Sequence, residues 1–167
     1  MPTTRKLNLT TPLKTRHDLP AAVRVALCAD LNQALADVSD LASQIKQAHW
    51  NVKGPNFYAL HLLFDKLAGE LSEPVDEVAE RLIALGGIAH GTVRMAASNS
   101  QVPELPESFE QAYVIAQLAD RVALVGKNLR KLIDVSDTQG DAVTADLYTH
   151  ITALLDKTLY LLESHLH

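Results

Sequence analysis

Cysteine is almost absent from this chain of 167 residues: Cys28 stands alone, which excludes an intramolecular disulfide and a zinc ribbon. Aromatic residues make up only 5%, and glycine and proline number seven each, which disfavours a β-rich or a disordered chain. There is no uncharged apolar run of about 18 residues, and no apolar N-terminal stretch like that of a signal peptide. The composition therefore predicts a cytoplasmic protein that does not span a membrane.

Hydrophobic residues, with alanine and leucine prominent, make up 47% of the chain, which is typical of one α-helical domain of this size. The net charge of −5 is uneven, because residues 1–19 carry +3 and the remainder carries −8. The charges of this first segment are Arg5, Lys6, Lys14, Arg16 and Asp18. We therefore expect a slightly basic tail over residues 1–19 and an acidic helical domain over residues 20–167.

Apolar residues recur at intervals of three and four, the spacing of amphipathic helices. This pattern predicts four helices, over about 20–52, 57–85, 107–135 and 141–166. Gly54 and Pro55 end the first helix, and Asn56 is expected to cap the second. Pro74 lies inside the second helix, where a missing N–H and a clash with the carbonyl of residue 70 predict a kink two residues before Asp76.

The connection from Gly86 to Pro106 is long enough to run the length of a bundle, and its segment 93–98 is expected to form a short helix. Two short-looped helix pairs joined by one long crossover are the arrangement of a ferritin-like four-helix bundle, so the predicted fold is all-α and ferritin-like. The alternative is an ordinary up-down bundle with a disordered insertion.

Side chains of the metal-binding types gather in and just before the second helix. His61 and Asp65 are four residues apart, as are Asp76 and Glu80, so each pair lies on one helix face where imidazole and carboxylate, or two carboxylates, can share a cation. On a helical wheel the four residues occupy one arc, and the leucine stripe of the same helix lies on another. These four side chains are therefore expected to point away from the bundle core.

A single copy of this helix cannot close one site with both pairs. Asp65 and Asp76 are about 16 Å apart along a continuous helix, far beyond coordination distance. The chain also has no Glu-x-x-His motif of the kind that builds di-iron sites inside bundles. Two copies packed antiparallel about a two-fold axis near residues 70–71 would bring the first pair of one subunit to the second pair of its partner. His49, at the end of the first helix, could supply a further nitrogen.

Other interpretations remain open at this point. His49 continues the apolar stripe of its helix and could be a hydrogen-bonded core residue. The carboxylates could form a solvated face, with Asp76 or Glu80 paired to Arg81. Trp50 and Tyr58 could be packing residues.

The segments KQAHWNVKGPNFYALHLLFD and VDEVAERLIALGG closely resemble the signature of the Dps family, the starvation-induced mini-ferritins, and the resemblance extends over nearly the whole chain. It implies a ferroxidase centre in which His49, His61 and Asp65 of one subunit and Asp76 and Glu80 of its two-fold partner bind two irons. It also implies a hollow dodecamer that oxidises Fe(II) with hydrogen peroxide, or with oxygen, and stores ferric mineral to protect the cell from oxidative damage.

The resemblance suggests further roles. Trp50, beside His49, is a candidate to pass or trap an electron, and Lys46 and Asp40 are candidates to support the ligands. An acidic pore for Fe(II) would draw on residues near the third and fourth helices, namely Asp120, Asp137, Asp141 and Asp146.

The sequence supports two other functional classes less well. A nucleoid-associated protein that coats DNA would use the basic tail, but four cations on an acidic body predict only weak, salt-sensitive binding. A di-iron oxygenase is disfavoured, because the candidate ligands lie off the bundle core. No Gly-rich phosphate loop, nucleophile elbow or His-Glu-x-x-His motif is present.

Overall fold

The computed structural model describes residues 13–167, and within this range the regular structure is entirely helical. Four long helical segments lie where the hydrophobic pattern predicted them, and one short helix lies where the length of the crossover predicted it, with ends that differ by a few residues. The described helices are α1 (Ala21–Asn51), α2 (Phe57–Glu70), α3 (Ser72–Ala84), α4 (Val93–Asn99), α5 (Gln111–Thr138) and α6 (Ala142–Glu163).

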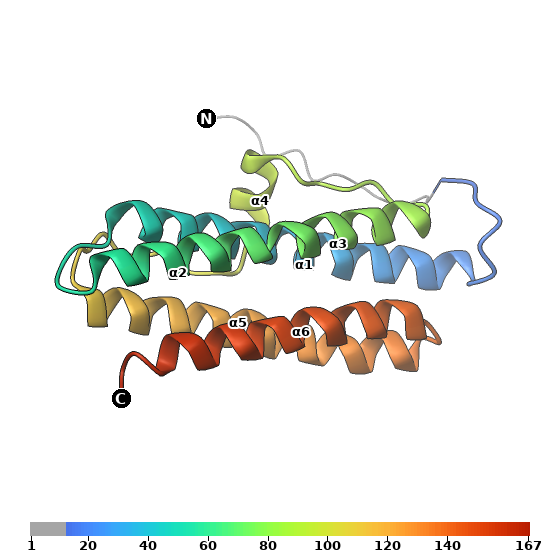
Figure 1. Ribbon diagram of the computed structural model, residues 1–167. Helices are drawn as coiled ribbons and strands as arrows, with labels where there is room; N and C mark the ends of the chain where they lie inside the picture. The colour runs from blue at the N-terminus through green and yellow to red at the C-terminus, as the bar shows by residue number, and fades with distance from the viewer. Residues whose placement is uncertain (1–12) are drawn as a thin grey trace.

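The helices form a bundle in two layers (Figure 1). One layer is α1 beside the bent pair α2 and α3, and the other is α5 beside α6. The crossover between α3 and α5 carries α4 across α1. Fully buried side chains from all the long helices fill the space between the layers, among them Leu31, Phe64, Val78, Leu118 and Tyr148. The ferritin-like prediction is confirmed, and the alternative of a disordered insertion is wrong because the crossover is ordered.

The second predicted helix is not continuous. It is interrupted at Leu71, whose backbone (φ −86°, ψ −8°) separates α2 from α3. Pro74 has no N–H to donate to the carbonyl of Glu70, so the helical ladder fails between these two residues. The distortion therefore appears one turn before Pro74, not at Pro74 itself as predicted. Asn56 also departs from expectation: it precedes α2, but its side chain makes no capping hydrogen bond.

Buried polar side chains fasten the crossover to the bundle. Arg121 of α5 is buried and donates to the carbonyls of Pro103 (3.0 Å) and Glu104 (2.6 Å) and to the side chain of Gln44 (3.0 Å). Asp37 of α1 accepts from the backbone N–H of Gln101 at 2.7 Å. Because buried carbonyls need donors, these contacts hold the crossover in one course.

The basic tail is described only from residue 13 onward, so Arg5 and Lys6 lie outside the described residues. The backbone N–H of Leu13 donates to the carbonyl of Gly86 at 2.7 Å, and the Lys14 and Arg16 side chains are exposed. The boundary between a tail and a domain at residue 19 stays a prediction. Within residues 13–167, no helix is long and apolar enough to cross a bilayer.

Asp141 caps the N-terminus of α6 and is almost fully buried. Its carboxylate accepts from the backbone N–H of Thr144 (3.1 Å) and from the Arg81 guanidinium of α3 (2.7 Å). Burial acts to raise the pKa of Asp141, but the hydrogen bonds from Arg81 and Thr144 outweigh it and lower that pKa from its ordinary value. The ionised form is therefore the one that the folded protein favours.

This lowered pKa predicts an acid-dependent loss of stability. A carboxylate whose pKa is lower in the folded than in the unfolded chain stabilises the fold above about pH 4, and the contribution disappears as the pH falls further. Asp141→Asn keeps a capping side chain but loses the charge, so we expect a loss of about 1–3 kcal/mol at neutral pH. Thermal unfolding of both proteins from pH 7 to pH 2, at one protein concentration, should show the difference shrinking below about pH 4. A constant difference would contradict the assignment.

Candidate metal centre

The centre of the candidate site is a pair of stacked histidines. His49 comes from the last turn of α1 and His61 from the second turn of α2, and the tight turn at Gly54 and Pro55 folds these two helix ends against each other. The ring centroids are 3.8 Å apart with an interplanar angle of 20°. The Nδ1 atom of His49 lies 2.7 Å from the carbonyl oxygen of His61, and the Nδ1 atom of His61 lies 2.9 Å from the carbonyl oxygen of His49.

This reciprocal pairing sets which ring nitrogens carry protons. A carbonyl oxygen only accepts, so each Nδ1 must be the donor. In the neutral imidazole the lone pair is then left on Nε2 of both rings, which is the arrangement seen in histidines that bind a metal through Nε2. His49 is buried and His61 is half-buried. His49 can therefore be both a hydrogen-bonded residue near the core and a candidate metal ligand.

Asp65 lies one turn beyond His61 on the same face of α2. Its side chain is about half exposed and forms an ion pair with Lys46 of α1. A hydrogen bond from the Lys46 ammonium, together with its positive charge, lowers the pKa of Asp65. The carboxylate is therefore ionised at neutral pH. Lys46 contacts this candidate ligand, whereas Asp40 lines a different pocket beside α4 and lies away from the histidines.

Asp76 and Glu80 are exposed on α3, four residues apart. Within residues 13–167, neither carboxylate makes a hydrogen bond or an ion pair with the same chain. The alternative in which one of them pairs with Arg81 is not seen, because the Arg81 guanidinium turns to Asp141 and Thr144. All four ligand candidates of α2 and α3 avoid full burial, whereas Leu60, Phe64, Val78 and Leu82 fill the core.

One chain does not bring these residues into a single cluster. Among the described residues, no three His, Cys, Asp or Glu side chains converge closely enough to hold a metal ion. The candidates therefore fall into two groups: a first arm of His49 at the end of α1 with His61 and Asp65 of α2, and a second arm of Asp76 and Glu80 on α3. The first arm has nitrogen and oxygen donors and the second has oxygen donors only; brought together, they would make a donor set suited to iron.

The remaining sequence candidates occupy different environments. The side chain of Trp50 is 60% exposed and that of Tyr58 is 70% exposed, so neither packs in the core of this chain. Asp141 is a buried helix cap, so its side chain is not available to line the predicted Fe(II) pore. Asp120 and Asp137 are exposed on α5.

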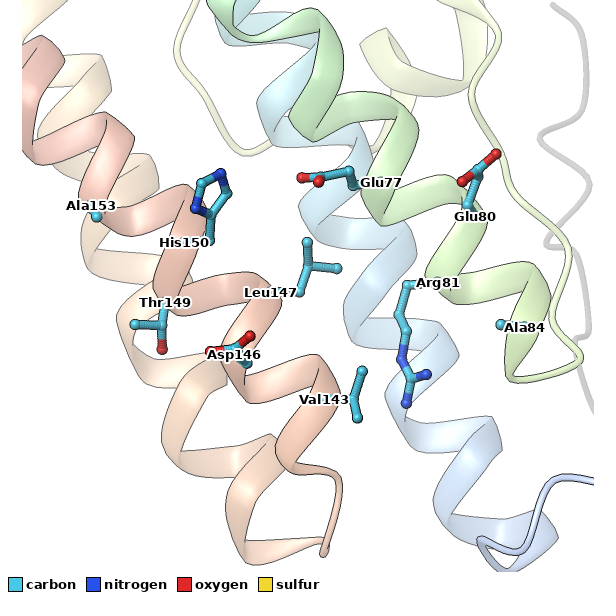
Figure 2. Close-up of a pocket in the computed structure, with 10 residues that line it drawn as sticks. All are labelled: Glu77, Glu80, Arg81, Ala84, Val143, Asp146, Leu147, Thr149, His150 and Ala153. Atoms are coloured by element: carbon cyan, nitrogen blue, oxygen red, sulfur yellow. The ribbon is translucent and has the colours of Figure 1, made fainter.

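A groove of about 790 Å³ runs between α3 and α6 (Figure 2). Asp146, a pore candidate, lines it together with Glu77 and His150. Sequence reasoning missed Glu77, because it is one of several acidic residues in this segment and no spacing pattern distinguishes it. Its place in the groove depends on α6, which follows about seventy residues later in the chain. Asp146 and His150, four residues apart on α6, were visible in the sequence, but their position opposite Glu77 was not.

Comparisons with known proteins agree with this architecture. The family model of the ferritin-like domain matches residues 28–167. The DNA protection during starvation protein of Agrobacterium fabrum is 40% identical over 153 residues, covering 91% of this chain and 94% of the relative. The protein of the same name from Listeria innocua is 32% identical over 138 residues, covering 81% of this chain and 88% of the relative.

The solved structures give the same result. DpsC from Streptomyces coelicolor superimposes with a TM-score of 0.91 at 31% identity, covering 98% of this chain and 96% of that one. The fold thus defines a ferritin-like protein with a long crossover. Within that class, the chain belongs to the Dps family, as the resemblance over nearly the whole sequence indicated.

Proposed function

We propose that this protein is a ferroxidase that oxidises Fe(II) at a site shared between two subunits and stores the ferric product. The observation that carries the proposal is the stacked pair of His49 and His61 beside Asp65, with both Nδ1 atoms engaged and both Nε2 atoms free to bind metal. The carboxylates of Asp76 and Glu80, which have no partner among residues 13–167, would complete the coordination from the partner subunit.

The sharing follows from the geometry of a two-fold axis. If the bent helices of two subunits run antiparallel past each other near Leu71, the first arm of each subunit meets the second arm of the other, and two equivalent sites result. Family membership supports such an assembly, and we propose the hollow dodecamer that this family forms. The exposed side chain of Trp50, next to His49, is then suitably placed to carry an electron near the site.

The proposed reaction uses two Fe(II) ions as substrates. Each ion gives up one electron, and together with two protons the two electrons reduce one hydrogen peroxide to two water molecules. Pairing the electrons avoids release of a hydroxyl radical. Carboxylate oxygens favour the harder Fe(III) product, while the imidazole nitrogens also bind Fe(II). The ferric ions then move inward and mineralise, and oxygen is the slower alternative oxidant.

Stopped-flow absorbance of Fe(II) oxidation by hydrogen peroxide under anaerobic conditions tests the proposal. The wild type should oxidise Fe(II) quickly, and a His49→Ala, Asp76→Ala double variant should approach the rate without protein. Size exclusion must show that the variant still assembles. Equal rates for wild type and the protein-free control would refute the ferroxidase assignment.

A second candidate function is suggested by the name of the relatives, DNA protection during starvation. Lys14 and Arg16 are exposed and could contact phosphates, and an assembly would multiply them. The acidic body would oppose such contacts. We therefore propose iron oxidation in the cytoplasm as the main function, with a weak, salt-sensitive association with the nucleoid as the secondary one.

A further inference from the structure

We infer that Arg81 is a positioning residue that sets the direction in which α3 presents Glu80 and Asp76 to the partner subunit. This inference rests on the proposed function, because it concerns the second arm of the same site. It comes from three features of the fold: the interruption at Leu71, the groove between α3 and α6, and the contacts of the Arg81 guanidinium.

The interruption makes α3 partly independent of α2. At Leu71 the continuous ladder of backbone hydrogen bonds is lost, so α2 does not rigidly fix the rotation of α3 about its own axis. The apolar face of α3, with Val78 and Leu82, packs towards the core. This packing is non-directional, so directed hydrogen bonds add a constraint on the rotation of α3 that aliphatic contacts alone do not supply.

On the side facing α6, α3 borders the groove, whose lining includes Glu77, Glu80, Arg81 and Ala84 of α3 together with residues of α6. In Figure 2, the Arg81 side chain extends from α3 towards the N-terminal end of α6. Within residues 13–167, it makes the only hydrogen bonds between α3 and the beginning of α6: Nε donates to the hydroxyl of Thr144 at 2.9 Å and Nη2 donates to Asp141 at 2.7 Å.

These two contacts hold the Arg81 guanidinium in one position and one orientation. The guanidinium is planar and its donors point in fixed directions, so two separate acceptors hold it more firmly than one ion pair would. Both acceptors are buried, as Asp141 is 3% exposed and Thr144 is 0% exposed. Such a pair is costly to break and is little screened by solvent.

The consequence for the site follows from helix geometry. Consecutive residues differ by about 100° around a helix, so anchoring Arg81 to α6 fixes the direction of its neighbour Glu80. Asp76 lies a little more than one turn before Glu80 and shares its face. Metal ligands need to be placed within about 0.5 Å of the productive geometry, so a small rotation of α3 is expected to weaken binding in the partner's site.

The test is a variant that removes the hydrogen bonds of Arg81 to Asp141 and Thr144 without leaving a buried charge. Arg81→Met keeps much of the aliphatic stem, and Asp141→Asn in the same chain avoids an unpaired carboxylate while retaining a capping side chain. The matched control is Arg130→Met, which removes an exposed ion pair with Asp156 between α5 and α6. Arg81→Lys serves as the conservative variant, because an ammonium can restore the contact with Asp141.

The readout is Co(II), used as a spectroscopic probe of the assembled protein. We expect its d–d absorption in the wild type to depend on His49 and Asp76. In the Arg81→Met, Asp141→Asn variant we expect the dissociation constant for Co(II) to rise at least tenfold and the band shape to change, in a protein that is still folded and assembled at the temperature of measurement. Arg81→Lys should recover part of the affinity, and Arg130→Met should match the wild type.

Two results would overturn the inference, and they are distinguishable. Wild-type Co(II) affinity and spectrum in the folded double variant would show that Arg81 is only structural, while the shared site stands. Absence of a Co(II) spectrum that depends on His49 and Asp76 in the wild type would refute the shared site itself, and the role of Arg81 with it.

Discussion

Two inactive variants are expected to restore iron oxidation when their subunits are mixed. Asp65→Asn damages the first arm of the site and Asp76→Asn damages the second, and each change alone should remove most of the activity of a uniform assembly. In a mixed two-fold pair, one site contains both damaged arms, but the other combines two intact arms. Random pairing makes about half of the pairs mixed, so about one quarter of the sites should be intact.

The experiment requires co-expression of the two variants, purification through different tags on each, and stopped-flow measurement of Fe(II) oxidation. The control is a mixture of Asp65→Asn with His49→Ala. Both of these changes lie in the first arm, so every site in any pair contains a damaged first arm and no activity should return. Recovery in the control, or none in the test mixture, would contradict a site shared between the two arms as assigned.

Replacement of Gly87 by alanine is expected to destabilise the fold by about 1–3 kcal/mol. A Cβ atom on Gly87 would lie 2.6 Å from Cδ2 of Leu82 and 2.7 Å from Sγ of Cys28, with Cβ of Cys28 at 3.1 Å. Leu82 is fully buried and Cys28 nearly so, hence neither side chain can move without disturbing the packing between α1 and α3.

The measurement is urea unfolding followed by circular dichroism, at one protein concentration because assembly contributes to stability. Gly126→Ala in α5 is the matched control. Its new Cβ atom would approach only Leu155, at 3.9 Å, and alanine favours a helix over glycine by up to about 1 kcal/mol. Unchanged or increased stability of Gly87→Ala would mean that the contact of α1 with the end of α3 is looser than described.

The helices were predicted correctly where local features of the sequence, such as apolar spacing and a terminal glycine, control the structure. The three-and-four spacing of Leu60, Phe64 and Leu67 marks the buried side of α2, and Gly86 ends the following segment with a positive φ of 86°. The break at Leu71 was misplaced because Pro74 removes a hydrogen bond whose other end is the carbonyl of Glu70. The sequence locates the missing donor but not where in the intervening turn the chain bends.

Contacts between distant residues could not be predicted in the same way. The stacking of His49 on His61 depends on how closely the turn at Gly54 brings α1 and α2 together. Arg81 stood next to Glu80 in the sequence, and a local pairing was the natural expectation. Its actual partner Asp141 is sixty residues away and becomes available only when α6 is placed beside α3.

From the amino-acid sequence alone we could predict the helical segments, the long crossover and the face on which His61, Asp65, Asp76 and Glu80 lie. These properties follow from periodicity, chain length and turn residues, all of which act over short stretches. Three other features became visible only in the folded protein: the stacked pair with His49, the ion pair of Lys46 with Asp65 and the anchoring of α3 through Arg81. Those features depend on the relative placement of helices, which is set by packing of the whole core and not by any one segment.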